Sequence, residues 1–293
     1  MDLQPVAQNL LYGLFLGGLY GMAAVGLSLV FGVLKVLNVA HGALLMLGGY
    51  VAFWLFDSYG IDPLLAIPLV AAMLFAVGLG LHVGLFQFVT HLQEEARIKN
   101  SLLIAFGLTL ILENLALRLW TADERAVTTS YAGEGFKLAG VAFPYTRMSG
   151  LVVALIAVLL LHGFLTRTYT GKAIRATAED WEAASLMGIN VQRTYVIAFA
   201  IGTALAGVAG TLVTLVDTIA PSVGLEWTLK ALVVVVLAGL GSILGAFGAG
   251  LLLSEAEAVS IYIFDSSNYR EIVGLILFLI VLLLRPQGLF GRR

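Results

Sequence analysis

The segment "NLLYGLFLGGLYGMAAVGLSLVFGV", residues 9–33, contains no charged side chain. An α-helix needs about 20 consecutive apolar residues to cross the hydrocarbon core of a bilayer. Within lipid the backbone must satisfy its own hydrogen bonds, and a helix does so inside one segment. The run therefore predicts a membrane-spanning helix and sets the pattern for the rest of the chain.

Eight further apolar runs follow the first one. They cover residues 42–56, 63–90, 98–119, 149–166, 194–216, 228–240, 243–263 and 270–285. The second and seventh of the nine runs are short for a complete crossing. We therefore expect an all-α, polytopic membrane protein with eight or nine spans, built as a single domain over residues 1–293.

The composition supports this class and excludes others. Hydrophobic residues make up 60% of the chain, charged residues 12%, and the mean hydropathy is +0.99, whereas soluble domains carry about 25% charged residues. The formal net charge is −2 and there is no basic run, so a nucleic-acid partner is not expected. Cysteine is absent, which excludes disulfides and thiol chemistry. The first ten residues lack the basic region of a signal peptide, so we expect the first span to be retained.

The basic residues predict the orientation, because lysine and arginine favour the cytoplasmic ends of spans. With the N-terminus outside, the cytoplasmic side holds Lys35, Arg97, Lys99, Arg167, Lys172, Arg175, Arg193, Arg285, Arg292 and Arg293. The other side keeps Arg118, Arg125, Lys137, Arg147, Lys230 and Arg270. We expect N-out, C-in topology, with a cytoplasmic loop at 167–193 and a periplasmic loop at 120–148.

Small residues recur at every fourth position in several runs. The sets are Gly13, Gly17 and Gly21; Ala76, Gly80 and Gly84; Ala198, Gly202, Ala206 and Gly210; and Gly241, Gly245 and Ala249. Such spacing places them on one helix face, where two backbones can approach closely. They predict helices packed against each other or against a sister subunit.

Two interruptions break the apolar pattern, "KVLNVAHG" at 35–42 and "AGLGSILG" at 238–245. Paired interruptions in the two halves of a chain can mark a transport site at a repeat interface. Asn38 and His41 lie in the first interruption, and Glu113 and Asn114 lie deep in the fourth run. Polar groups are costly in lipid and usually face a bundle interior or an aqueous path. We interpret these four as path-lining candidates, with hydrogen bonding between helices as an equal alternative, and expect Glu255 and Glu257 near a membrane interface.

Motifs for catalysis and nucleotide hydrolysis are missing. The phosphate-binding pattern GxxxxGK requires a following Ser or Thr, but Gly171 and Lys172 are followed by Ala173. Neither an HExxH zinc motif nor a GxSxG nucleophile motif occurs. The chain is therefore expected to bind no cofactor and to have no enzymatic activity of its own.

The most charged stretch is "GKAIRATAEDWEAASLMGIN", residues 171–190. Thr177 as N-cap, Asp180 three residues later and Gly188 as the stop predict a helix over 178–187. Trp181, Ala184, Ser185 and Gly188 share one face of that helix, which suits docking in a groove of a partner protein. The alternative is a helix lying among lipid headgroups, but its acidic residues argue against contact with anionic lipids.

The chain resembles the permeases of bacterial ABC importers for branched-chain amino acids, specifically the LivH-type subunit. The matching blocks are residues 18–42, 171–190, 229–253 and "RPQGLFG" at 285–291. The resemblance implies that the cytoplasmic loop couples the permease to an ATPase through Gly171, Arg175, Ala178, Glu179, Asp180, Ala184 and Gly188.

The resemblance also implies the partners and the location. These are a second, LivM-type permease, two cytoplasmic ATPase subunits that hold ATP and Mg, a periplasmic amino-acid-binding protein, and the bacterial inner membrane. Relatives that carry urea, amides or other small solutes leave the solute open. A secondary transporter driven through Glu113 and His41, or a membrane enzyme using them as acid or base, remain as alternatives from other classes.

Overall fold

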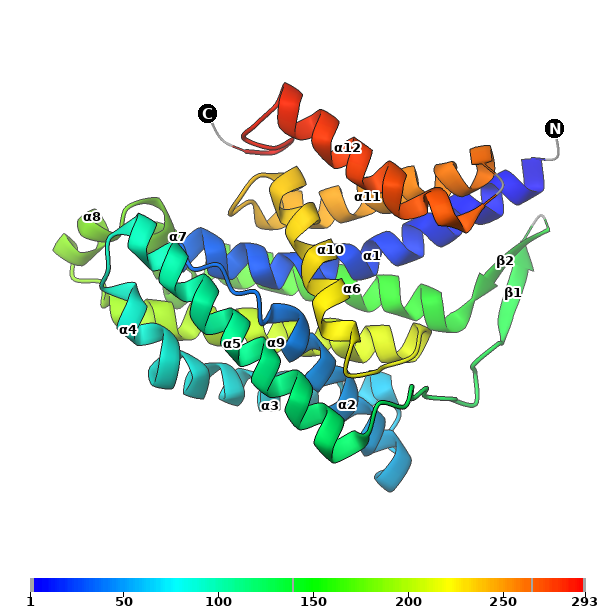
Figure 1. Ribbon diagram of the computed structural model, residues 1–293, viewed down its shortest axis with the longest axis horizontal. Helices are drawn as coiled ribbons and strands as arrows, with labels where there is room; N and C mark the ends of the chain where they lie inside the picture. The colour runs from blue at the N-terminus through cyan, green and yellow to red at the C-terminus, as the bar shows by residue number, and fades with distance from the viewer. Residues whose placement is uncertain (1–2, 139, 265, 292–293) are drawn as a thin grey trace.

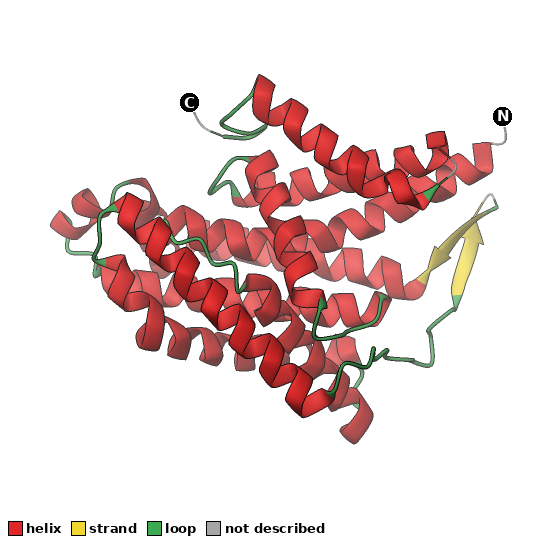
Figure 2. Ribbon diagram, viewed as in Figure 1, coloured by secondary structure: helices red, strands yellow, loops and turns green. Residues whose placement is uncertain are grey.

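The computed structural model describes residues 3–138, 140–264 and 266–291 (Figure 1). Its helices are α1 Leu3–Leu34, α2 His41–Tyr59, α3 Pro63–Leu81, α4 Gln87–Thr90, α5 Glu94–Trp120, α6 Tyr145–Arg167, α7 Tyr169–Glu179, α8 Trp181–Leu186, α9 Val191–Val216, α10 Val223–Ala238, α11 Ile243–Phe264 and α12 Arg270–Leu284. A five-residue π-helix, His82–Phe86, joins α3 to α4. A 3-10 turn, Ser267–Tyr269, precedes α12. Helix dominates the described residues, as Figure 2 shows.

The nine predicted spans each coincide with a helix. Within the described residues, six segments are long and apolar enough to cross a membrane: residues 4–34, 63–90, 94–120, 145–167, 191–216 and 243–264. The remaining three, α2, α10 and α12, are 19, 16 and 15 residues long. The chain is thus a multi-pass, all-α membrane protein, and the prediction of its fold class is confirmed. The basic residues Arg292 and Arg293 lie outside the described residues.

Small residues hold the centre of the bundle together. The long helix α1 packs against α6, α9 and α11. A Cβ atom added to Gly17 would lie 2.7 Å from the Cα atom of Leu251 on α11. The stripes on α1 and α9 are therefore packing faces, as expected. The stripe of Ala76, Gly80 and Gly84 is different, because it faces outward and a Cβ at either glycine would meet nothing within 4 Å.

The packing around each glycine determines whether it can be replaced by alanine. A Cβ at Gly210 would collide with the carbonyl oxygen of Leu45 on α2. We expect Gly210→Ala to destabilise the bundle by about 1–3 kcal/mol, the usual cost of overpacking. Gly107, in the middle of α5, has open space, so Gly107→Ala should be neutral or stabilising by up to about 1 kcal/mol through helix propensity. Thermal unfolding in detergent checks both; equal midpoints for the two variants would contradict the close contact of α2 and α9.

The connections gather at two ends of the bundle. At one end, Arg97 donates to the carbonyl oxygen of Leu34 (3.1 Å). At the other end, a short antiparallel hairpin pairs β1 (Gly135–Leu138) with β2 (Val141–Pro144). The Gln8 side chain accepts a hydrogen bond from the Ala142 backbone N–H (2.7 Å), which fastens the hairpin to α1. The hairpin lies in the loop expected at 120–148 and was not predicted.

The rest of that loop is fastened to the start of α3. The Tyr131 hydroxyl donates to the Asp62 carboxylate (3.0 Å), and the same carboxylate oxygen accepts from the Leu64 backbone N–H. Burial, together with this hydrogen bond and the charge of Asp62, raises the pKa of Tyr131 to about 12. The tyrosine therefore stays protonated and keeps donating throughout the physiological pH range.

Candidate functional site

The segment between α6 and α9 forms a compact two-helix unit. The Thr168 hydroxyl oxygen caps α7 by accepting from the Gly171 backbone N–H (3.0 Å). A Cβ at Gly171 would collide with the carbonyl oxygen of Phe164, so only glycine allows α7 to fold back this closely onto α6. On the inner face of α7, Ala173 and Ile174 are buried, and the helix also contacts α1 and α9. Any displacement of α7 is therefore passed directly to three spans.

The second helix of the unit begins later than predicted. Asp180 has extended backbone angles and caps α8, because its Oδ1 accepts from the backbone N–H groups of Glu182 (2.9 Å) and Ala183 (3.0 Å). Thr177 is not a cap but a buried residue inside α7. The predicted single helix over 178–187 is thus wrong: the segment bends at Asp180 because its carboxylate takes the first two free donors of a new helix. Gly188, with φ of +83°, ends the turn as expected.

Large apolar side chains are exposed at the tip of this unit. Leu186 is 89% exposed, Met187 83% and Trp181 48%. Ala184, predicted on the docking face, is only 4% exposed and packs inward. Figure 1 shows α8 at the end of the molecule opposite the N-terminus. An exposed apolar tip on a polar helix pair is typical of a protein contact, and it shares only Trp181 with the face that the helical spacing suggested.

Loss of the cap should loosen α8 without unfolding the spans. We expect Asp180→Ala to cost about 1 kcal/mol locally, because two backbone donors lose their acceptor. Hydrogen exchange at the Glu182 and Ala183 amides should quicken, while exchange in α9 should not change. Asp180→Asn keeps an oxygen acceptor and serves as the control. Unchanged protection in the alanine variant would contradict the capping role.

A cavity of about 550 Å³ lies directly beneath α7. Arg175, Ala178 and Glu179, three of the predicted coupling residues, line it from α7. The other walls come from the last turns of α1 and α6, the α10–α11 turn and Phe290. We call this the inner cavity. It places the predicted coupling segment against an opening at the end of the bundle.

The C-terminal block "RPQGLFG" forms part of this wall. Backbone N–H groups of Leu289 and Phe290 donate to the carbonyl oxygens of Leu237 (2.9 Å) and Ala238 (2.8 Å) at the end of α10. The interruption at 238–245 is therefore a tight turn, with positive φ at Gly239 and Gly241, that is covered by the C-terminal tail. Sequence reasoning assigned no role to this tail.

The interruption at 35–42 is re-entrant. Residues 35–40 are not helical, and α2 begins with His41, whose Nε2 lies 2.9 Å from the carbonyl oxygen of Ala23. Ala23 precedes the end of α1 by 11 residues, so the chain returns about 16 Å into the bundle before α2 starts. Thr228 of α10 serves both sides of the junction: its hydroxyl oxygen accepts from the Gly42 N–H (2.9 Å) and lies 3.0 Å from the carbonyl oxygen of Val39. Non-helical backbone at this depth is tolerated because protein surrounds it.

The four predicted path residues do not line one cavity, although Glu113 lies close to the start of α2: a Cβ atom added to Gly224 would be 3.1 Å from the Cα of Ala43 and 3.3 Å from Oε1 of Glu113. Asn38 and His41 are both 1% exposed, within the packed re-entrant segment. Glu113 is partly buried, with one oxygen near Gly224 of α10, and Asn114 is on the exposed face of α5. None of the four residues lines the inner cavity or either of two other cavities, of about 410 and 290 Å³. Their role in transport stays a prediction.

A buried ion cluster was missed by the sequence analysis. Glu257 is fully buried, and its carboxylate binds Lys230 (2.9 Å), Arg270 (2.8 Å) and the Tyr20 hydroxyl (3.1 Å). Two cations from α10 and α12 compensate its charge inside the protein, and the expectation that it lies near a membrane interface stays a prediction. A cavity of about 410 Å³ opens beside the cluster and is also lined by Glu226. Two basic residues in otherwise apolar runs were the available signal.

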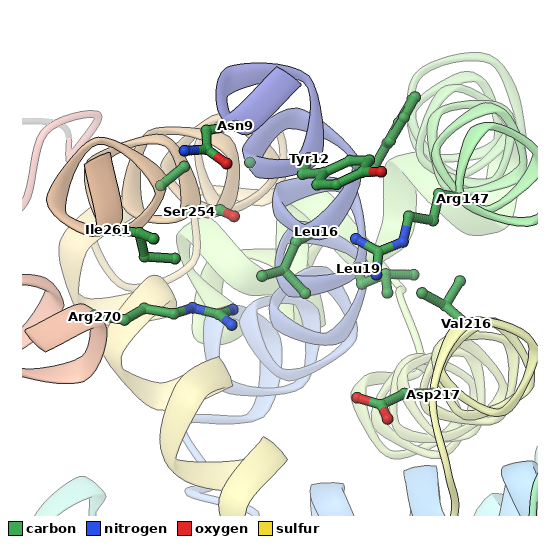
Figure 3. A pocket seen from close by; sticks show the side chains of 13 residues that line it. Asn9, Tyr12, Leu16, Leu19, Arg147, Val216, Asp217, Ser254, Ile261 and Arg270 are labelled. Atoms are coloured by element: carbon green, nitrogen blue, oxygen red, sulfur yellow. The ribbon is translucent and has the colours of Figure 1, made fainter. Parts of the chain in front are cut away.

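A third cavity, of about 290 Å³, lies beside the first half of α1 (Figure 3). Its walls come from the first half of α1, the start of α6, the end of α9, the second half of α11 and the start of α12. Charged side chains of both signs line it, namely Arg147, Asp217 and Arg270. We call this the outer cavity.

The family is decided by similarity over almost the whole chain. Residues 9–282 match the family described as the permease component of the branched-chain amino acid transport system. The chain belongs to this family. The permease BraD of Pseudomonas aeruginosa is 32% identical over 97% of this chain and 95% of its own length, and LivH of Escherichia coli K12 is 33% identical over the same shares. Both are named high-affinity branched-chain amino acid transport system permease proteins. No solved structure matches the chain.

Membership of this permease family fits the features described above. The matched residues include the re-entrant segment at 35–42, the tight turn at 238–245, and all of α7 and α8. They also include both partners of the buried ion pair Lys230–Glu257. The LivH-type resemblance proposed from four sequence blocks is thus confirmed. The family match also covers the outer cavity, from Asn9 to Arg270.

Proposed function

We propose that this permease is the membrane subunit of an ATP-driven importer for the branched-chain amino acids leucine, isoleucine and valine. The observation that carries the proposal is the 32–33% identity, over 97% of the chain, to permeases named for that transport. The protein moves solute and performs no chemistry on it. ATP and Mg are held by separate ATPase subunits, which accounts for the lack of a phosphate-binding motif.

The partners follow from the same reading. They are a second, LivM-type permease, two cytoplasmic ATPases and a periplasmic binding protein, in a bacterial inner membrane. The N-out, C-in orientation puts the α7–α8 unit in the cytoplasm. There an ATPase can bind the exposed side chains of Trp181, Leu186 and Met187. The predicted coupling residues then fall into two groups. Arg175, Ala178 and Glu179 face the inner cavity. The others determine the shape of the α7–α8 unit, namely Gly171, Asp180, Ala184 and Gly188.

Transport should follow the ATPase cycle through α7. The helix contacts α1, α6 and α9, so a pull on α8 moves the inner ends of three spans together. Such rigid-body displacement of packed elements is how domain closure is usually transmitted. The inner cavity lies where these ends meet, and it widens or narrows as they move.

The proposal is tested by purifying the tagged chain from native membranes, identifying its partners by mass spectrometry, and reconstituting the complex in liposomes. We expect ATPase subunits and a second permease to co-purify, and leucine uptake to require ATP and to survive collapse of the proton gradient. If an uncoupler abolishes leucine uptake and ATP has no effect on it, the protein is a secondary transporter and the proposal is wrong.

A further inference from the structure

The outer cavity holds a cation and an anion that do not neutralise each other. In the part of the chain that the structure describes, neither Arg147 nor Asp217 forms an ion pair. Each is oriented by a neighbour: the Arg147 guanidinium carbon lies 4.7 Å from the centroid of the Tyr12 ring, and an Asp217 oxygen accepts from the Thr218 backbone N–H (2.8 Å). Figure 3 shows both charged groups on the side of the cavity formed by Val216. A ligand that enters meets opposite charges already in position.

The surface next to these charges is apolar. Leu16, Leu19 and Ile261 line the cavity from α1 and α11, and Figure 3 shows Leu16 between the two arginines. Arg270, on the far wall, is already bound by Glu257 and Tyr20. The free charges are therefore confined to one side, and the remaining surface favours an aliphatic group because burying such a side chain is favourable by about 1.5–3 kcal/mol.

A buried hydroxyl also lacks a partner at this cavity. Ser254 on α11 is 1% exposed, its Oγ has no hydrogen-bond partner among the described residues, and it lines the outer cavity. Buried polar atoms are nearly always satisfied, so an orphaned hydroxyl at a cavity wall indicates a missing ligand or water. A hydroxyl can donate to a carboxylate or accept from an ammonium group.

We propose that the outer cavity is a binding subsite for the zwitterion of an aliphatic α-amino acid, an assignment that rests on the proposed transport function. Arg147 binds the carboxylate, Asp217 binds the ammonium group, and Leu16, Leu19 and Ile261 receive the side chain. The volume of about 290 Å³ lies just below the usual range for ligand sites, about 300–1,000 Å³, which suits a small solute. A neutral sugar or a simple anion needs only part of this arrangement.

The cavity is closed toward the opposite end of the bundle. A Cβ atom added to Gly21, two residues beyond the lining residue Leu19, would lie 2.8 Å from Phe247, so α11 touches α1 directly below the cavity. In the N-out orientation the amino acid reaches the site from the periplasm and stops there. The subsite thus receives solute after its delivery and before the bundle opens inward.

The test uses the complete importer in liposomes and photo-leucine, a diazirine analogue of leucine, followed by peptide mapping. We expect labelling of the α1 and α11 peptides that contain Leu16 and Ile261. L-leucine should compete, whereas 4-methylpentanoate, which lacks the ammonium group, and isopentylamine, which lacks the carboxylate, should compete at least about tenfold less well, because each leaves one charged hydrogen bond unmade. Arg147→Gln and Asp217→Asn should each raise the KM for leucine uptake about tenfold or more and lower the labelling in parallel.

The matched control is Arg118→Gln, an exposed arginine at the end of α5 that lies outside the cavity; it should leave KM and labelling unchanged. ATP-driven leucine uptake with no label in the outer cavity, or equal competition by the two truncated analogues, would overturn the subsite and leave the transport function intact. Labelling competed by leucine in a complex that does not import leucine would overturn the function and leave the subsite. Both variants are first checked for wild-type unfolding midpoints.

Discussion

The double variant Leu186→Asp, Met187→Asp should lose ATP-driven uptake by at least about 30-fold while the permease itself stays folded. Truncating one interface hot spot costs at least about 2 kcal/mol, which corresponds to about 30-fold in affinity. Both side chains are more than four-fifths exposed at the tip of α8, so charging them removes no internal contact of the bundle. The measurement is the affinity of the purified ATPase for the permease, together with uptake in proteoliposomes.

The control for this variant is Tyr59→Asp at the last residue of α2. Tyr59 is 77% exposed, so it is a similarly open apolar position outside the α7–α8 unit. It should affect neither ATPase affinity nor uptake. If the double variant binds the ATPase like the wild type, the apolar tip of α8 is not the docking surface and the coupling assignment must move elsewhere.

Glu257→Gln should destabilise the folded chain by about 3–5 kcal/mol, the usual effect of breaking a buried ion pair. The carboxylate holds both Lys230 and Arg270 at 2.9 and 2.8 Å. A neutral glutamine leaves Arg270 without a carboxylate partner among the described residues and leaves Lys230 with only the exposed Glu271, 3.9 Å away. Unfolding in mixed detergent micelles measures the change.

Two further variants make this prediction specific. Glu255→Gln, on the same helix but not part of the cluster, should change the free energy of unfolding by less than about 0.5 kcal/mol. Adding Lys230→Met to Glu257→Gln should recover part of the loss, because one of the orphaned cations is removed. If Glu257→Gln and Glu255→Gln have the same unfolding midpoint, the cluster contributes little to the stability of the fold.

Periodic apolar runs predicted the spans well, since lipid permits few alternatives to a helix. Each of the nine expected runs lies on a helix, although α1 begins at Leu3 instead of near residue 9. The hairpin at 135–144 escaped prediction because strand pairing depends on the register between two segments, not on either segment alone. The amphipathic pattern around residue 181 failed differently: helical spacing alone cannot reveal that Asp180 turns the chain and buries Ala184.

The candidate sites depended even more on contacts between distant segments. Lys230, Glu257 and Arg270 come from three helices, and nothing in their spacing links them. Arg147 and Asp217 likewise line one cavity only because α6 begins where α9 ends. By contrast, Asn38 and His41 were recognised correctly as an interruption, because an asparagine and a histidine inside an apolar sequence are visible without any knowledge of partners.

The outer and inner cavities lie at different levels along α1 and are separated by a thin barrier of packed protein. On α1, the outer cavity reaches to Leu19 and the inner cavity begins at Ser28, a separation of nine residues or about 14 Å along the helix. That is roughly half of the 30 Å hydrocarbon thickness. Gly21 lies in this interval, and a Cβ atom there would be 2.8 Å from the Phe247 ring and 2.9 Å from the Phe247 carbonyl oxygen of α11. A shear of α1 along α11 would therefore move the Phe247 ring away from Gly21, so any shift of the barrier between the two cavities is coupled to the position of one aromatic side chain.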